Sequence, residues 1–151
     1  MINARAEGIG DKPSFRAALK KRRCLVPANG YYEWKQTPGG KVPYLFRLRD
    51  REQFAFAGLY ESWDDENGNA VKTYTSITTE PNGLAVEVHN RMPAILPRQD
   101  EEEWLDPEAA DAAQVTRLLR PYEAYLMNSD PVSAKVGNPS NNDPSLIVPT
   151  S

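Results

Sequence analysis

The chain has 151 residues, of which 40% are hydrophobic and 26% are charged, and its formal net charge is −3, which suits one globular domain with a real core. It contains no apolar run long enough to cross a membrane and no secretory signal at its N-terminus, so a cytoplasmic protein without membrane contact is expected. Only one cysteine and one histidine are present, which excludes an internal disulfide and a Cys/His zinc cage, and no metal or cofactor is predicted.

The first half of the chain has the pattern of a strand, a short helix and a series of strands. Residues 2–7 alternate apolar and polar side chains, as a strand does. A helix is predicted from Pro13 to about Arg22, capped by Ser14. Its inward face would carry Phe15, Ala18 and Leu19. Strands are predicted at about 23–26, 29–35, 43–49, 54–60 and 71–79, separated by Gly- and Pro-rich turns.

The second half mixes turns, helices and an extended tail. Residues 80–89 predict a short helical turn, and residues 90–96 an extended segment that Pro93 keeps away from a sheet centre. Helices are predicted at about 98–105 and 107–119, and the tail at 133–149 as a strand followed by turns. The pattern favours one α+β domain over 1–151, with a mostly antiparallel β-sheet or small barrel core and a few short flanking helices.

Charge is distributed unevenly along the chain. Residues 1–49 hold 11 basic against 3 acidic residues, a balance of +8, and residues 50–151 hold 7 against 18, a balance of −11. This split favours a basic surface that could follow a phosphate backbone. The alternative is ordinary mixed surface, because strands from distant parts of the chain can interleave.

Three extended segments carry polar side chains two residues apart, which places each pair on one face of its strand. The pairs are Asn3 with Arg5, Glu33 with Lys35, and His89 with Arg91. If these faces line one groove, they form an acid/base site surrounded by phosphate-binding cations. The alternatives are a solvated Glu33 and a structural His89.

The run "YYEWK" at 31–35 places Glu33 on the same strand face as Tyr31 and Lys35. Tyr32 and Trp34 share the other face. They are expected to anchor the strand from behind, which leaves Glu33 free to face a site.

Cys24 allows a thiol hydrolase hypothesis with His89 as the base, since two adjacent arginines would lower the pKa of an exposed thiol. In "RRCLVP", however, the cysteine alternates with apolar residues at a strand start. Burial as a small hydrophobic residue is the favoured interpretation.

Six stretches together resemble the SRAP family, the SOS response-associated peptidases, and the resemblance runs almost end to end. They are "NARAE" at 3–7, "RRCLVPANGYYEW" at 22–34, "FAFAGLYESW" at 54–63, "TYTSITTEPN" at 73–82, "HNRMPAIL" at 89–96 and "VGNPSNNDPSLI" at 136–147. "HNRMP" combined with "GYYEW" is highly specific for this family.

The resemblance implies a monomeric sensor and shield for abasic sites in single-stranded DNA, acting in the cytoplasm on damaged nucleoid DNA. In the family, removal of the initiator methionine exposes a cysteine whose amine and thiol condense with the ring-opened sugar to a thiazolidine crosslink. By resemblance, the catalytic residues are Glu33, His89 and Asn3, and the phosphate-binding residues are Arg5 and Arg91. Glu33 would move the proton of imine formation, and His89 would serve ring opening.

The sequence departs from the family at its start. "MINARAE" lies several tens of residues inside family members, so the first strands and the catalytic cysteine are expected to be missing, and Ile2 would follow Met1. A gene start placed at an internal methionine, a truncated remnant and a split protein would each account for this. Crosslinking by this chain, and whether it is an enzyme, are therefore open. A noncatalytic single-stranded DNA-binding module is the main alternative function, and the Cys24/His89 hydrolase is another.

Overall fold

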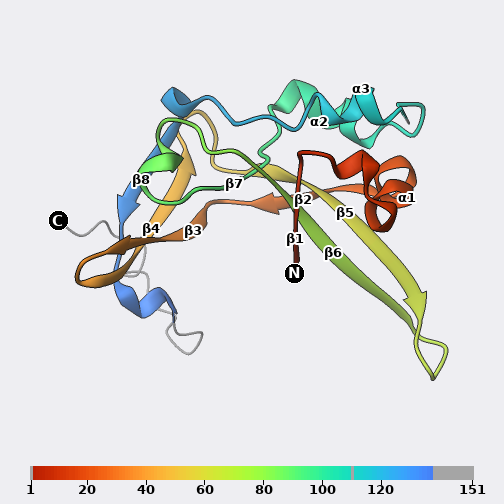
Figure 1. The fold of residues 1–151 in the computed structure, drawn as a ribbon, viewed down its shortest axis with the longest axis horizontal. Helices are drawn as coiled ribbons and strands as arrows, with labels where there is room; N and C mark the ends of the chain where they lie inside the picture. Colours follow the sequence, from red (N-terminus) through yellow and green to blue (C-terminus); the bar gives the residue numbers. More distant parts are fainter. Residues whose placement is uncertain (1, 110, 138–151) are drawn as a thin grey trace.

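The computed structural model describes residues 2–109 and 111–137, and its strands form two sheets (Figure 1). The first sheet has the order β1-β6-β5-β2, with β7 paired to β6, and the second has the order β3-β4-β8. The strands are β1 (Ile2–Arg5), β2 (Arg23–Ala28), β3 (Tyr31–Thr37), β4 (Gly40–Leu48), β5 (Phe54–Asp64), β6 (Ala70–Thr79), β7 (Met92–Pro93) and β8 (Met127–Pro131).

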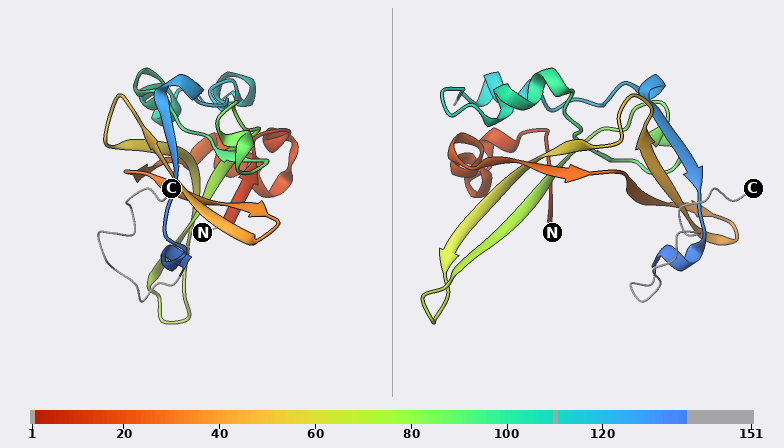
Figure 2. Two further views of the ribbon diagram at one scale, coloured as in Figure 1. Left: turned by 90° about the vertical axis from the view of Figure 1, so that its left-hand side faces the viewer. Right: turned by 180° about the vertical axis from the view of Figure 1, so that it is seen from behind.

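Within the described residues, three α-helices and four 3-10 turns connect the strands. They are α1 (Pro13–Lys21), α2 (Arg98–Leu105), α3 (Ala112–Thr116), η1 (Ile9–Asp11), η2 (Ala85–Glu87), η3 (Ala124–Leu126) and η4 (Ala134–Gly137). Figures 1 and 2 show the three helices gathered at one end of the molecule and the three-stranded sheet at the other. The expected α+β class with a mostly antiparallel core is confirmed. The described residues form two open sheets rather than a barrel, and β1 pairs with β6 in parallel.

Several element boundaries differ from the sequence prediction. The cap of α1 is Lys12, with Pro13 in the first turn and no side-chain cap hydrogen bond, so Ser14 is not the cap. Of the helix predicted at 107–119, only Ala112–Thr116 (α3) is α-helical in the structure. In the tail, the strand is β8, before residue 133, and residues 134–137 form η4; the rest of the predicted tail lies outside the described residues.

The hydrophobic core has two clusters, one under each end of the molecule. The first cluster lies between the three α-helices and the β1-β6-β5-β2 sheet, and it includes Ile77 and Trp104, both fully buried. The second lies beside the three-stranded sheet and includes Phe46 and Tyr122. Because β2 belongs to one sheet and leads through a short turn into β3 of the other, the two ends are joined by continuous backbone.

The outer halves of β5 and β6 extend from the body as a two-stranded ribbon (Figures 1 and 2). Pairing continues from Tyr60 opposite Tyr74 to Asp64 opposite Ala70. Closer to the body, Gly58 lies under Val26 of β2. A side chain at position 58 would place its Cβ 2.9 Å from Val26 Cγ2, so only glycine fits there without a shift. In the described part of the chain, no helix is long and apolar enough to span a membrane.

Candidate active site

Glu33 and His89 lie beside one another, although 56 positions separate them in the chain. Glu33 belongs to β3, and His89 lies in the loop that follows η2. Glu33 Oε1 is 3.8 Å from His89 Nε2, and 29% and 41% of the two side chains are exposed. The separation is longer than a direct hydrogen bond, and both side chains are partly exposed to solvent.

The loop that carries His89 also sets the orientation of its ring. The Arg91 N–H donates to His89 Nδ1 at 3.2 Å, so the neutral ring carries its proton on Nε2, on the side of Glu33. The Arg91 carbonyl lies 3.4 Å from the same Nδ1 and accepts a hydrogen bond when Nδ1 carries a proton. The backbone of Arg91 thus fixes the orientation of the His89 ring.

Glu33 is held by the strand on which it lies. Its Oε1 accepts a hydrogen bond from the Trp34 N–H at 3.4 Å. Tyr31, on the same face, stacks on Phe46 at 4.8 Å and meets the edge of Phe56 at 5.8 Å. Burial, and then the charge of Glu33, raise the pKa of Tyr31. Its hydroxyl is buried without a hydrogen-bond partner among the described residues.

These contacts correct the expected orientation of β3. Tyr31, and not Tyr32 or Trp34, anchors the strand in the core, and 36% of Tyr32 is exposed. The strand alternation is as predicted, but the face that carries Glu33 is the one that continues into the core. Glu33 therefore lies at the rim of the aromatic cluster rather than on a separate polar face.

A second group of side chains surrounds Glu7, the residue that sequence reasoning missed. The Arg91 guanidinium donates two hydrogen bonds to the Glu7 carboxylate, at 2.6 and 3.0 Å, and one to the Thr78 carbonyl at 2.9 Å. Only 16% of the Arg91 side chain is exposed. Arg91 thus ties the histidine loop to β6 and to the turn after β1. The only signal for Glu7 was its place on the same strand face as Asn3 and Arg5.

Arg5 belongs to this second group, whereas Asn3 is less closely placed. Arg5 lies opposite Thr78 in the β1–β6 pair, and its charge contributes to lowering the pKa of Glu7. Asn3 is exposed and lies opposite Ser76. Among the described residues, no hydrogen bond joins its side chain to Glu33 or His89. The polar residues therefore form two neighbouring groups, the Glu33–His89 pair and the Arg5–Glu7–Arg91 cluster, linked by the segment 89–91.

The remaining member of the sequence pairs, Lys35, takes a different partner. Its Nζ lies 6.0 Å from the centre of the Tyr44 ring, which is a cation–π distance. Lys35 therefore packs along the sheet beside Glu33.

Cys24 has the surroundings of a structural residue. Burial raises the pKa of its thiol. The neighbouring arginines do not counteract this, because Arg22 binds the Tyr60 carbonyl and Glu61, and Arg23 binds main-chain carbonyls including that of Trp104. Cys24 is only partly buried, so its predicted burial as a small hydrophobic residue is met in part. Within the described ranges, no group of three or more His, Cys, Asp or Glu side chains could hold a metal ion.

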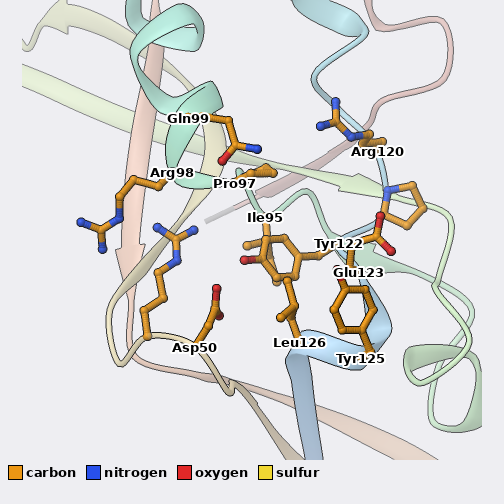
Figure 3. Close-up of a pocket in the computed structure, with 12 residues that line it drawn as sticks. Asp50, Ile95, Pro97, Arg98, Gln99, Arg120, Tyr122, Glu123, Tyr125 and Leu126 are labelled. Carbon is orange, nitrogen blue, oxygen red and sulfur yellow. The ribbon is translucent and has the colours of Figure 1, made fainter.

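A separate cavity of about 530 Å³ lies where the β4–β5 loop, the start of α2 and the segment before β8 meet (Figure 3). Tyr122 lies in its middle, with Arg98 and Arg120 on opposite sides. Neither Glu33 nor His89 lines it. The candidate active site is therefore distinct from this cavity.

The ion pair between Glu7 and Arg91 leads to a pH-dependent prediction. The hydrogen bond from Arg91 lowers the pKa of Glu7 from 4.5 to about 2, so the pair stabilises the fold above pH 4.5 and is lost as the pH falls toward 2. Because 56% of the Glu7 side chain is exposed, we expect Glu7→Gln to lower the free energy of unfolding at pH 7 by less than about 1 kcal/mol. Urea denaturation at pH 7 and pH 3 should show this difference shrinking at the lower pH.

The matched control is Glu66→Gln, which removes a carboxylate from the exposed turn between β5 and β6. Its stability should equal that of the parent at both pH values. A direct check is an NMR titration of the Glu7 carboxyl carbon. A midpoint near 4.5 would mean that the ion pair does not form in solution.

Comparison with known proteins adds the following relationships. Residues 1–139 match the model of the SOS response associated peptidase (SRAP) family. The chain is 48% identical over 148 residues to the abasic site processing protein YoqW of Bacillus subtilis and 31% identical over 168 residues to the abasic site processing protein HMCES of Gallus gallus. It spans 66% of the length of the first, slightly under two thirds, and 49% of the second.

A solved structure of a protein from Bacteroides thetaiotaomicron has a closely similar fold. Its TM-score is 0.91 at 37% identity, and the match covers 99% of this chain and 66% of that one. A protein from Bordetella bronchiseptica matches 87% of this chain and 64% of its own length, with a TM-score of 0.77 at 29% identity.

Proposed function

Because this chain belongs to the SOS response associated peptidase family, we propose that it recognises abasic sites in single-stranded DNA, with Glu33 and His89 as its acid/base pair. The relatives named abasic site processing proteins support this assignment. The observation that most directly supports it is the 3.8 Å distance between Glu33 Oε1 and His89 Nε2, with both side chains partly exposed.

The proposed chemistry joins an N-terminal cysteine to the ring-opened abasic sugar. The amine adds to the C1′ aldehyde, and the resulting carbinolamine loses its hydroxyl as water to give an imine. The thiol then adds to the imine carbon and closes a thiazolidine, so one water is released for each crosslink. Loss of the hydroxyl requires a proton donor and addition of the amine requires a proton acceptor, and a carboxyl group beside an imidazole can fill both roles.

Arg5 and Arg91 are proposed to contact the phosphates beside the abasic site. The two arginines differ in availability. Arg5 is exposed, whereas the Arg91 guanidinium is already engaged by Glu7 and Thr78. We therefore assign the main phosphate contact to Arg5, and to Arg91 the additional role of holding the loop of His89 in place. Asn3, opposite Ser76 on the same strand face as Arg5, would position the reacting group.

Residues 1–151 contain one cysteine, Cys24, whose nitrogen is a peptide nitrogen within β2, so these residues offer no adjacent amine and thiol for this reaction. We expect a protein of residues 1–151 alone to bind abasic single-stranded DNA without forming a heat-stable adduct, and denaturing gels after incubation should show free DNA only. A shifted band that Cys24→Ser abolishes would contradict this and support the thiol hydrolase alternative.

The phosphate contacts can be tested on the same reversible complex. Binding should weaken steeply with salt, and Arg5→Ala should reduce the slope of log affinity against log salt by about 0.7, the value for one phosphate of a single strand. Arg16→Ala, on α1, is the matched control and should leave the slope unchanged. If abasic and undamaged strands bind equally well, the noncatalytic single-stranded DNA-binding module is the better description.

A further inference from the structure

The three-stranded sheet carries a groove on the face opposite Glu33. Register places Glu33 opposite Tyr44 and Tyr32 opposite Leu45, so Glu33 and Tyr32 point to different faces of the sheet. The groove follows the Tyr32 face and has a volume of about 930 Å³. We call it the outer groove; its polar lining consists of Asn29, Tyr32, Arg47, Arg49, Arg51, Glu52 and Gln53.

A row of arginines forms one wall of the outer groove. At the end of β4, Phe46 and Leu48 are buried on the core side, whereas Arg47 and Arg49 alternate with them and are exposed. Side chains two residues apart on an extended strand lie about 6 to 7 Å apart. This spacing suits successive phosphates of an extended nucleic-acid strand better than a single small anion.

The arginines differ in how far their charge is already neutralised. Arg51 is paired with Glu101 at 3.4 Å and bound to the Leu96 carbonyl. Arg49 donates only its Nε, to the Met127 carbonyl at 3.0 Å, and no side-chain partner of Arg47 is present among the described residues. Arg47 and Arg49 therefore offer free guanidinium N–H groups to the groove, against the one carboxylate of Glu52.

An aromatic surface lies beside these cations. The ring of Tyr32 is 36% exposed, and its centroid is 6.4 Å from that of Trp34 on the same face. Gly30 also lines the groove and packs closely against β4. A Cβ there would lie 2.9 Å from the Phe46 carbonyl oxygen and 3.4 Å from Arg47 Cγ, so no other residue fits without moving β4.

From these features we propose that the outer groove is a second binding surface for single-stranded nucleic acid, on which Tyr32 stacks against a base while Arg47 and Arg49 contact phosphates. An exposed aromatic ring beside arginines on a sheet is a surface that unpaired bases can use, whereas a duplex keeps its bases stacked inside. The site is separate from the abasic-site chemistry, because Glu33 faces the other side of the sheet. It would hold undamaged DNA beyond the reacting sugar.

The test uses undamaged oligothymidine, so that it does not depend on the proposed abasic-site function. Fluorescence anisotropy would compare the parent with Tyr32→Leu and Arg47→Gln. We expect Tyr32→Leu to weaken binding about 5- to 100-fold, the range of losses when one stacked base is released. Arg47→Gln should lower the salt slope by about 0.7. The matched controls are Tyr74→Leu on the exposed ribbon and Arg16→Gln on α1, both of which should bind like the parent.

A second measurement uses the unaltered protein and does not depend on how the variants fold. Ultraviolet crosslinking to an oligonucleotide that contains bromodeoxyuridine, followed by peptide mass spectrometry, should attach DNA to Tyr32 or Trp34. Crosslinks confined to the other face, or affinities of both variants equal to those of their controls, would overturn the proposal. If Tyr32→Leu weakened the binding of a duplex of the same length as well, this would contradict the stacking of Tyr32 on an unpaired base. A protein that fails to prefer abasic DNA yet shows these effects would contradict only the proposed function.

Discussion

Glu33→Gln should slow crosslinking by roughly 10²–10⁴-fold in a form of the protein extended so that its processed N-terminus is cysteine. Glutamine keeps the shape of the side chain and can still accept the Trp34 N–H, but it cannot exchange a proton with the substrate. This substitution should test proton transfer without disturbing the packing of β3, because Tyr31, which anchors the strand, is left in place. Reversible binding of abasic DNA should stay within about twofold of the parent.

The measurement is the single-turnover crosslinking rate at saturating abasic single-stranded DNA. His89→Ala is the companion variant, and it should slow ring opening or crosslink reversal more than it weakens binding. Lys35→Gln is the matched control, since Lys35 lies on the same strand face as Glu33 but directs its charge to the Tyr44 ring. A change of about 1.36 kcal/mol in the barrier corresponds to a tenfold change in rate. A Glu33→Gln crosslinking rate within about twofold of the parent would therefore mean that Glu33 takes no part in the reaction.

The local elements were predictable where hydrophobic periodicity and turn residues agree. The strand from Phe54 and the strand that ends at Thr79 follow from alternation, and the turn between them follows from its Asp, Asn and Gly residues. At the turn, β5 ends four residues later than predicted and β6 begins one residue earlier, because backbone pairing continues after the apolar pattern stops. Pairing needs no buried side chain, so sequence alternation cannot show where it ends.

The helix predicted at 107–119 shows a different limit. Asp111 caps α3, but the N–H groups of Leu118 and Leu119 bond to carbonyls three residues back, so the helix passes into tight turns after Thr116. Both leucines are buried in the first core cluster. Their apolar spacing continues the helical pattern, but tertiary packing decides the backbone conformation.

The candidate site was only partly predictable for a related reason. Alternation correctly placed Glu33 with Tyr31 and apart from Tyr32, but it cannot say which face meets the core when both faces carry aromatic rings. The approach of His89 to Glu33, and of Arg91 to Glu7, joins segments far apart in the chain. No local pattern contains such contacts, and the sequence pointed to the first only through the hypothesis that the three polar pairs share one groove and through family resemblance.

Trp104→Ala should lower the free energy of unfolding by about 3–5 kcal/mol, a large part of the 5–15 kcal/mol typical of a domain. The Trp104 side chain is fully buried, and its Nε1 donates to the Cys24 carbonyl at 2.9 Å, which fastens α2 to β2. The Arg23 guanidinium lies 5.6 Å from the ring centre and bonds to the Trp104 carbonyl. Alanine would leave a cavity beneath that charge as well as a carbonyl without its donor.

Urea denaturation followed by far-UV circular dichroism measures this effect without relying on tryptophan fluorescence. Trp63→Ala is the matched control, because Trp63 is 49% exposed on the β5–β6 ribbon, and its loss should change stability by about 0.5 kcal/mol or less. Since Glu33 packs at the rim of the other core cluster, the folded Trp104→Ala protein should bind abasic DNA like the parent. A Trp104→Ala midpoint equal to that of Trp63→Ala would mean that α2 does not depend on this anchor. Weakened binding by the folded variant would mean that the two core clusters are coupled through β2 and β3.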